Sequence, residues 1–153
     1  MRALLSILML LPSFAFAQIE INTEIFKVVE TKTESGKAKQ EWVKADSIVP
    51  GDKVGYLIRF NNKGEEAAGD LVLNNPIPEN TFYIENSARG ANSAIRFSAD
   101  GGKQFAEADK LFIEKNGKKM LAGPKDYTNV RWLISSELPA GESSSVQYVV
   151  QVK

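Results

Sequence analysis

The chain has 153 residues with 19 basic and 19 acidic side chains, and it contains neither histidine nor cysteine. The missing cysteines and histidines exclude disulfides, a thiol nucleophile, the usual zinc ligands and the most common general base. Charges of both signs are interspersed along the chain, which argues against nucleic acid or a charged membrane surface as the partner.

The first 17 residues have the pattern of a secretory signal peptide. Arg2 provides a positive end, residues 3–11 are apolar, and residues 15–17 (AFA) place small side chains where a signal peptidase cleaves. We expect cleavage between Ala17 and Gln18, no stable membrane insertion afterwards, and a periplasmic or cell-surface location. A membrane anchor is the alternative, but the apolar stretch has about half of the ~20 residues that a spanning helix needs. Residues 18–153 are then one domain.

Apolar and polar residues alternate in most of the chain, which predicts strands with one buried face. The expected strands lie at residues 25–30, 41–44, 53–60, 71–73, 95–97, 111–114, 119–121, 130–134 and 146–152. Only residues 103–112 show any helical pattern. We therefore predict an all-β domain of about eight to ten strands.

Turn signals separate these runs. Pro50-Gly51-Asp52 precedes the third run, and Asn75-Pro76-Ile77-Pro78 follows the fourth. Asp100-Gly101 and Asn116-Gly117 suit two-residue hairpins, because Gly and Asn accept the positive φ that such turns need. The polar segment 61–66 (NNKGEE) is interpreted as a loop with solvated charges rather than a binding site.

The order of these turns and strands resembles a family of bacterial domains, the "domain of unknown function eleven" family. The similarity covers residues 45–152 and is carried by PGD at 50–52, NNKG at 61–64, NPIP at 75–78, the segment 83–88 and LPAGE at 138–142. The resemblance implies an immunoglobulin-like antiparallel β-sandwich in exported bacterial proteins, with a strand that ends at Ser87-Ala88. It implies no catalytic residues.

Residues 98–105 (SADGGKQF) are similar to the S-x-D-x-G-x-x-F hairpin known as the Asp box. In that motif the Ser and Asp side chains bond the backbone of the turn, and the aromatic residue packs beneath it. The corresponding residues here are Ser98, Asp100, Gly102 and Phe105. A single copy cannot form a propeller, so we expect a structural role rather than glycan binding.

Candidate catalytic and metal-binding groups have structural explanations. Ser143-Ser144-Ser145 lies between a turn and a strand, with no base to activate a hydroxyl. Calcium is the least improbable ion, but Asp100 and Asn116 belong to no D-x-D-x-D-G loop, and no metal or other cofactor is expected. The acidic residues that a glycosidase would need in pairs are interpreted as solvated; they are Glu65, Glu66, Asp70, Glu79 and Glu85.

The two tryptophans differ in their setting. Trp132 is in phase with Val130 and Ile134, which predicts a core position. Trp42 lies between charged and apolar neighbours and is the candidate ligand contact. We predict a non-enzymatic exported module for protein–protein interaction or envelope structure, acting through loops or an exposed edge strand. The alternatives are a module that binds glycan or envelope polymer, and a hydrolase that uses carboxylates.

Overall fold

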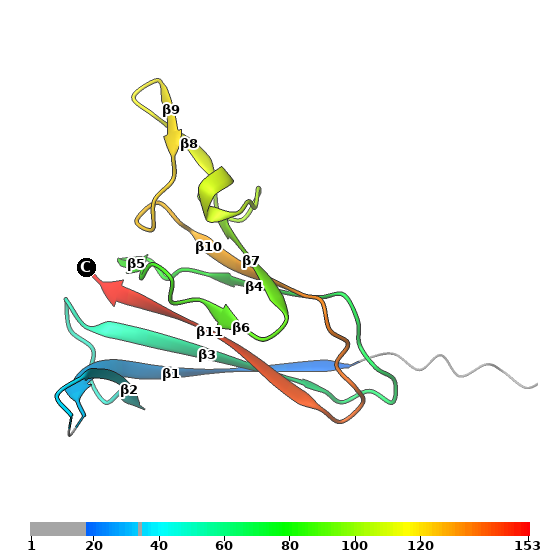
Figure 1. Cartoon of the computed structure of the whole chain (residues 1–153). Helices are drawn as coiled ribbons and strands as arrows, with labels where there is room; N and C mark the ends of the chain where they lie inside the picture. Colours follow the sequence, from blue (N-terminus) through cyan, green and yellow to red (C-terminus); the bar gives the residue numbers. More distant parts are fainter. Residues whose placement is uncertain (1–17, 34) are drawn as a thin grey trace, which may run out of the picture.

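The computed structural model describes residues 18–33 and 35–153, and this part of the chain is antiparallel β-structure (Figure 1). Its eleven strands are β1 (Ile19–Lys32), β2 (Ala38–Lys44), β3 (Lys53–Asn62), β4 (Leu71–Pro76), β5 (Thr81–Tyr83), β6 (Arg89–Gly90), β7 (Ser93–Ser98), β8 (Phe112–Lys115), β9 (Lys118–Leu121), β10 (Asn129–Ile134) and β11 (Ser143–Val152). The all-β prediction is confirmed. The strands outnumber the expected eight to ten because β5 and β6 are too short to show alternation.

Helical structure in the described residues is limited to the three-residue 3-10 helix η1 (Ala108–Lys110), inside the segment with a helical pattern. No helix in residues 18–33 or 35–153 has the length and apolar character needed to cross a membrane. The predicted signal peptide, with Ala17 at its cleavage site, lies outside the described residues. Gln18 is the first residue that the structure describes.

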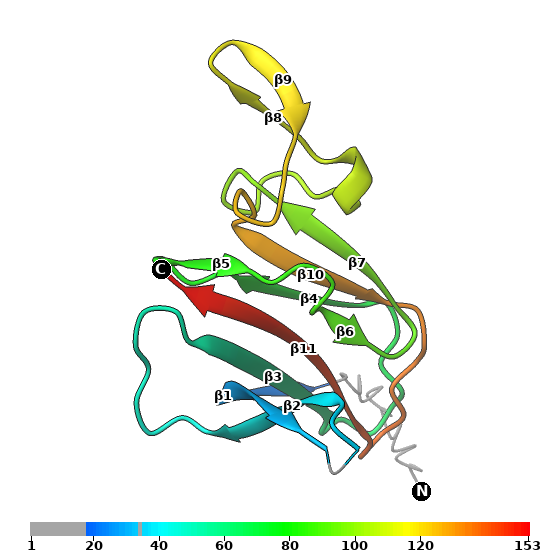
Figure 2. The ribbon, with the colours of Figure 1, turned by 60° about the vertical axis from the view of Figure 1, so that its left-hand side comes forward.

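The strands form three sheets, and all their pairings are antiparallel. The six-stranded sheet has the order β2-β1-β3-β11-β5, with β6 also paired to β11; the three-stranded sheet has the order β4-β10-β7; β8 and β9 form a hairpin. Figure 2 shows β1 and β2 on the side farthest from β7 and β10, and the β8–β9 hairpin projecting beyond the larger sheets. The two ends of the six-stranded sheet therefore have different surroundings.

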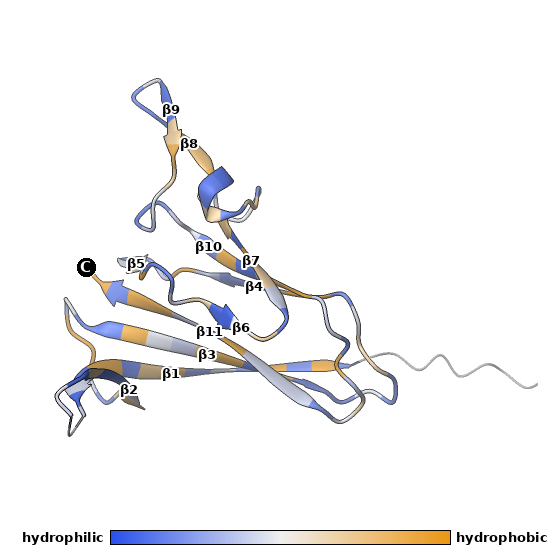
Figure 3. Ribbon diagram, in the orientation of Figure 1, coloured by the Kyte–Doolittle hydropathy of each residue, from blue (hydrophilic) through white to orange (hydrophobic). Residues whose placement is uncertain are grey.

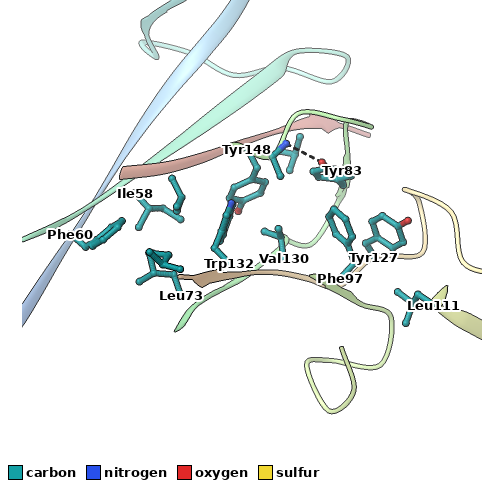
Figure 4. Close-up of a cluster of buried hydrophobic side chains, with 14 of the residues drawn as sticks. Ile58, Phe60, Leu73, Tyr83, Phe97, Leu111, Tyr127, Val130, Trp132 and Tyr148 are labelled. Carbon is teal, nitrogen blue, oxygen red and sulfur yellow. Dashed lines mark hydrogen bonds between the residues drawn. The ribbon is translucent and has the colours of Figure 1, made fainter. Parts of the chain in front are cut away.

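Alternating side chains of the two larger sheets meet in one buried cluster (Figure 4). Trp132 of β10 and Tyr148 of β11 are fully buried, with ring centroids 6.0 Å apart. The prediction that Trp132 belongs to the core is confirmed. Burying such side chains stabilises the fold by roughly 1.5–3 kcal/mol each, so this cluster holds the two sheets together.

One predicted hairpin turn is confirmed and one is wrong. Asn116 and Gly117 join β8 directly to β9 with φ angles of +53° and +71°. At the predicted turn Asp100-Gly101, the positive φ angles are instead those of Gly101 and Gly102. The chain pairs again only where Phe97 bridges Ala106, so Asp100-Gly101 belongs to a longer loop.

The family resemblance implies a strand through residues 83–88, and this expectation is wrong. β5 ends at Tyr83, and the Tyr83 hydroxyl accepts a hydrogen bond from the Ala88 amide at 3.0 Å. Asn86 has a φ of +56°, and Ser87 donates its backbone N–H to Ile84 O at 3.1 Å. These bonds close a turn over the end of β11 in place of a strand.

Candidate functional site

The N-terminal half of β1 has a strand partner on one side only. β1 pairs with β3 from Ile19 to Val28, but its pairing with β2 begins at Phe26. Within the described residues, the segment 19–25 therefore forms an open edge, which is a template for a further strand.

The hydrogen-bonding parity shows which backbone groups face this edge. In an antiparallel ladder, residue pairs that are hydrogen-bonded alternate with pairs that are not. Lys63 N donates to Gln18 O at 2.7 Å, so the pair of Gln18 and Lys63 is a bonded one. The even-numbered residues of β1 therefore form the backbone bonds to β3. Thr33 N donates to Lys37 O at 2.9 Å, so the odd-numbered residues bond β2 where β2 is present. Beyond β2, the N–H and C=O groups that point outward belong to Ile19, Ile21, Thr23 and Ile25.

The side chains of the same odd-numbered residues are on the face of the sheet that carries the core. Ile21 lies opposite Phe60 and Ile25 opposite Tyr56, yet these two isoleucines are 55% and 48% exposed. They are exposed because the three-stranded sheet covers the faces of β3 and β11, whereas β1 extends past it (Figure 2). An open backbone edge and an uncovered apolar face therefore coincide on one strand.

The charges on the other face of this segment are balanced. Glu24 pairs with Arg59 at 2.6 Å, and Glu20 pairs with Lys63 at 3.6 Å, both across the β1–β3 ladder. Each pair is exposed and contributes little to stability. Their effect is that an approaching strand meets no net charge along β1.

Other edges carry the residues by which proteins block strand addition. β2, at the end of the six-stranded sheet, has Lys39 and Lys44 exposed among seven residues, and β4 ends at Pro76. Lysine and proline at an edge disfavour pairing with another chain. Residues 19–25 contain neither, so this half of β1 lacks both of these protections.

A second feature lies on the opposite face of the six-stranded sheet, where a hollow of about 290 Å³ surrounds Trp42. Polar side chains from β2, β11 and the turn after β5 line it, including Gln40, Asn86 and Gln147. Trp42 also lines it, and its indole packs on β3 beside Phe26, with the ring centroids of Phe26 and Trp42 5.8 Å apart. Trp42, the residue that the sequence analysis selects as a ligand contact, is therefore half-buried and borders a polar depression.

A third surface is the β8–β9 hairpin, whose strands combine apolar side chains with charged ones (Figure 3). Phe112, Met120 and Leu121 are each about half exposed. Lys119 covers the Phe112 ring at 4.9 Å from its centroid. This hairpin offers apolar side chains but no open hydrogen-bonding pattern as long as that of β1.

The turn at Pro50-Gly51-Asp52 is held by its acidic residue. Asp52 Oδ2 accepts the Val49 amide at 2.9 Å and pairs with Lys27 at 2.8 Å. These bonds hold the pKa of Asp52 below its ordinary value, and the bond from Lys27 has the largest effect. Gly51 has a φ of +90°, and its amide donates to Val152 O, so the turn anchors the end of β11.

The Asn75-Pro76-Ile77-Pro78 segment connects the two larger sheets. Asn75 Nδ2 donates to the Tyr148 hydroxyl at 2.6 Å, and that hydroxyl donates to Pro76 O at 3.2 Å. Pro78 O accepts bonds from the Thr81 amide and hydroxyl, which starts β5. Burial raises the pKa of Tyr148, so the phenol stays protonated and keeps this donor.

The residues of the Asp-box pattern lie together at the end of β7. Ser98 is fully buried; its hydroxyl donates to Asp100 Oδ1 at 2.7 Å and accepts the Gly102 amide at 3.0 Å. Asp100 Oδ1 also accepts the amides of Lys103 and Gln104, both at 3.0 Å. These bonds, that from Gln104 first, hold the pKa of Asp100 below its ordinary value.

The aromatic member of the pattern, Phe105, covers a charged side chain. The Arg131 guanidinium carbon lies 3.4 Å from the centroid of its ring. The Arg131 Nε beneath is buried without a hydrogen-bond partner in the described residues, so the ring contact contributes to holding this cation. The arrangement is that of a structural turn.

The polar segment after β3 is organised by one buried side chain, Asn62, which is fully enclosed. Its amide donates to Glu66 O at 2.7 Å and to Leu138 O at 2.9 Å, and its Oδ1 accepts the Gly64 amide at 3.0 Å. All its polar atoms have partners inside the protein. Asn62 therefore closes the loop and has no free side-chain polar atom with which to bind a ligand.

The candidate catalytic residues are dispersed. Ser143-Ser144-Ser145 opens β11 opposite residues 59–61 of β3. No group of three or more acidic residues suited to a metal ion occurs in the described residues. The five candidate carboxylates are exposed on three separate loops; they are Glu65, Glu66 and Asp70 between β3 and β4, Glu79 between β4 and β5, and Glu85 between β5 and β6.

The chain matches no protein-family model, no curated protein and no solved structure. Function is therefore inferred from the open edge and the hollow. Sequence reasoning missed residues 19–24 of the edge, although Ile19, Ile21, Thr23 and Ile25 alternate with polar residues in the pattern that predicts a strand.

Proposed function

We propose that this chain is an exported, non-enzymatic, immunoglobulin-like β-sandwich module that binds a protein partner through β1. The partner supplies an extended segment that pairs with residues 19–25. Support comes from the outward N–H and C=O groups of Ile21 and Thr23 and from the half-exposed side chains of Ile21 and Ile25 on the same strand. The sandwich and family assignments rest on the turn pattern at residues 45–152 and on the two sheets that share a core.

The chemistry of the edge defines the partner segment. Main-chain hydrogen bonds provide affinity in strand addition, and alternate side chains provide specificity. On one face the segment meets Ile21 and Ile25, so its side chains there are apolar. On the other face it meets the paired Glu20 and Glu24, so its side chains there are polar and do not add charge.

The deciding experiment removes one outward backbone donor and leaves the β3 ladder intact. Thr23→Pro deletes the amide that faces the edge, whereas the amides that bond β3 belong to even-numbered residues. Thr23→Ala is the matched control, because it removes the same side chain but keeps the amide. A photo-crosslinking residue at Ile21 in the native host identifies the partner, and calorimetry with the purified partner compares the variants.

We expect Thr23→Pro to weaken binding by about tenfold to a hundredfold, because one bond is lost and its acceptor is left unpaired. Thr23→Ala is expected to bind within about threefold of the wild type. Hydrogen exchange of residues 19–25 slows in the complex if the segment pairs there. Equal binding by the wild type and Thr23→Pro, or no crosslinked protein from Ile21, refutes the proposal.

A further inference from the structure

The Trp42 indole lies with one face flat on the backbone of β3. A Cβ added at Gly55 would be 2.6, 2.7 and 2.8 Å from three consecutive atoms of the six-membered ring of Trp42. Similar distances to three neighbouring ring atoms place that position over the ring face rather than at its edge. Glycine at position 55 is therefore what permits the close contact, and the other face of the indole is directed away from the sheet.

The surroundings of the indole are polar but balanced in charge. Lys53 lines the hollow and is paired with Glu30 at 2.6 Å, a contact that lowers the pKa of this glutamate. The remaining charges at the hollow are one cation, Arg89, and one anion, Glu85. A strongly charged ligand gains little from such a site, whereas a neutral ligand with many hydroxyl groups finds donors and acceptors.

Amide side chains provide these donors and acceptors around the ring. Gln40 is on the strand that carries Trp42, Gln147 is on β11, and Asn86 is on the turn that replaces the expected strand. Each carboxamide carries both a donor and an acceptor. The volume of about 290 Å³ is near the lower end of the roughly 300–1,000 Å³ of small-molecule pockets, which limits the ligand to a small ring or the end of a chain.

From this arrangement we propose that the hollow binds a neutral saccharide. One sugar ring packs its C–H face on the outward face of Trp42, and its hydroxyls bond Gln40, Asn86 and Gln147. The site lies on the face of the sheet opposite to the side chains of Ile21 and Ile25 and is independent of the partner that binds β1. A single stacked ring predicts weak binding that is strengthened where the saccharide is displayed in many copies.

The two tryptophans make the test direct. Trp132 is fully buried in the core, so a change in fluorescence on adding a sugar reports on Trp42. The probes are the linear tetrasaccharides of N-acetylglucosamine, of β-1,4-linked glucose and of α-1,4-linked glucose, titrated into the mature protein. We expect one of them to shift Trp42 emission with saturation, and binding to be independent of salt concentration.

Trp42→Leu is expected to weaken binding by at least about tenfold. Phe112→Leu is the matched control, because it removes an exposed aromatic ring on the distant β8–β9 hairpin and should bind as the wild type does. Gln147→Ala is a second variant that leaves the packing on Gly55 intact and should also weaken binding. No saturable signal with any probe, or equal binding by the wild type, Trp42→Leu and Gln147→Ala, overturns the proposal.

Discussion

Replacing Asn62 by alanine is expected to destabilise the fold by about 3 kcal/mol. The side chain has no exposed surface, and alanine deletes its bonds to the carbonyl oxygens of Glu66 and Leu138 and to the Gly64 amide. A neutral hydrogen bond contributes about 1 kcal/mol net, so three bonds set the estimate.

The environment of the three partners keeps the loss near this value. Leu138 O retains a second donor, the Ala68 amide at 2.9 Å, so it is not left unpaired. Glu66 is exposed and Gly64 half-buried, so water can reach the Glu66 carbonyl oxygen and the Gly64 amide when they lose the Asn62 side chain. If all three groups were sealed from solvent, each would add a desolvation penalty of roughly 1–3 kcal/mol.

Urea unfolding followed by circular dichroism measures the change, and the slope with urea should be unaltered. For a domain of this size the loss lowers the melting temperature by about 10 °C. Asn61→Ala is the matched control, because Asn61 makes no side-chain hydrogen bond within the described residues; its effect should stay within about 0.5 kcal/mol. A difference of less than about 1 kcal/mol between the two variants would refute the view that Asn62 organises the loop.

Three further substitutions test other parts of the fold. Gly55→Ala should push Trp42 off β3 and raise its quenching by acrylamide; unchanged quenching would contradict the stacked geometry. Asp100→Asn should destabilise at neutral pH. Folding lowers the pKa of Asp100, so the stabilisation from its carboxylate is present above the unfolded pKa of about 3.9 and is lost as pH falls through the folded pKa. The difference in urea midpoint between the wild type and the variant should therefore shrink in acid. A constant difference would count against the carboxylate bonds. Tyr148→Phe, which leaves Asn75 without its phenol partner, should cost about 1–3 kcal/mol by urea unfolding, and a neutral result would remove this link between the sheets.

The alternation of apolar residues was sufficient to locate most of the strands. Val130, Trp132 and Ile134 have period two and are all buried, because one face of β10 packs on the other sheet. Alternation did not predict burial where the opposite sheet leaves a strand uncovered. The segment 19–24 alternates equally well, but Ile21 is more than half exposed, because β1 extends beyond the three-stranded sheet.

Local turn chemistry was predictable when a bond lies within the turn. Asn116-Gly117 adopts the positive φ angles that a two-residue hairpin needs, and Ser98 with Asp100 bonds the backbone of its own loop. The segment 83–88 was not predictable in the same way. Ser87 there donates its hydroxyl to Val149 O, a residue 62 positions later in the chain, and that partner exists only after β11 is in place.

The sequence by itself determined the all-β character of this protein and its tightest turns, because side-chain period and the φ preferences of Gly and Asn act over a few residues. Tertiary structure decided which strand edge stays open and which aromatic ring is outside the core. β1 pairs with β3 along its first ten residues but with β2 only from Phe26 onward, and this offset depends on pairings between distant segments. The same register places Trp42 on the outer face, over Gly55, where it lines the hollow.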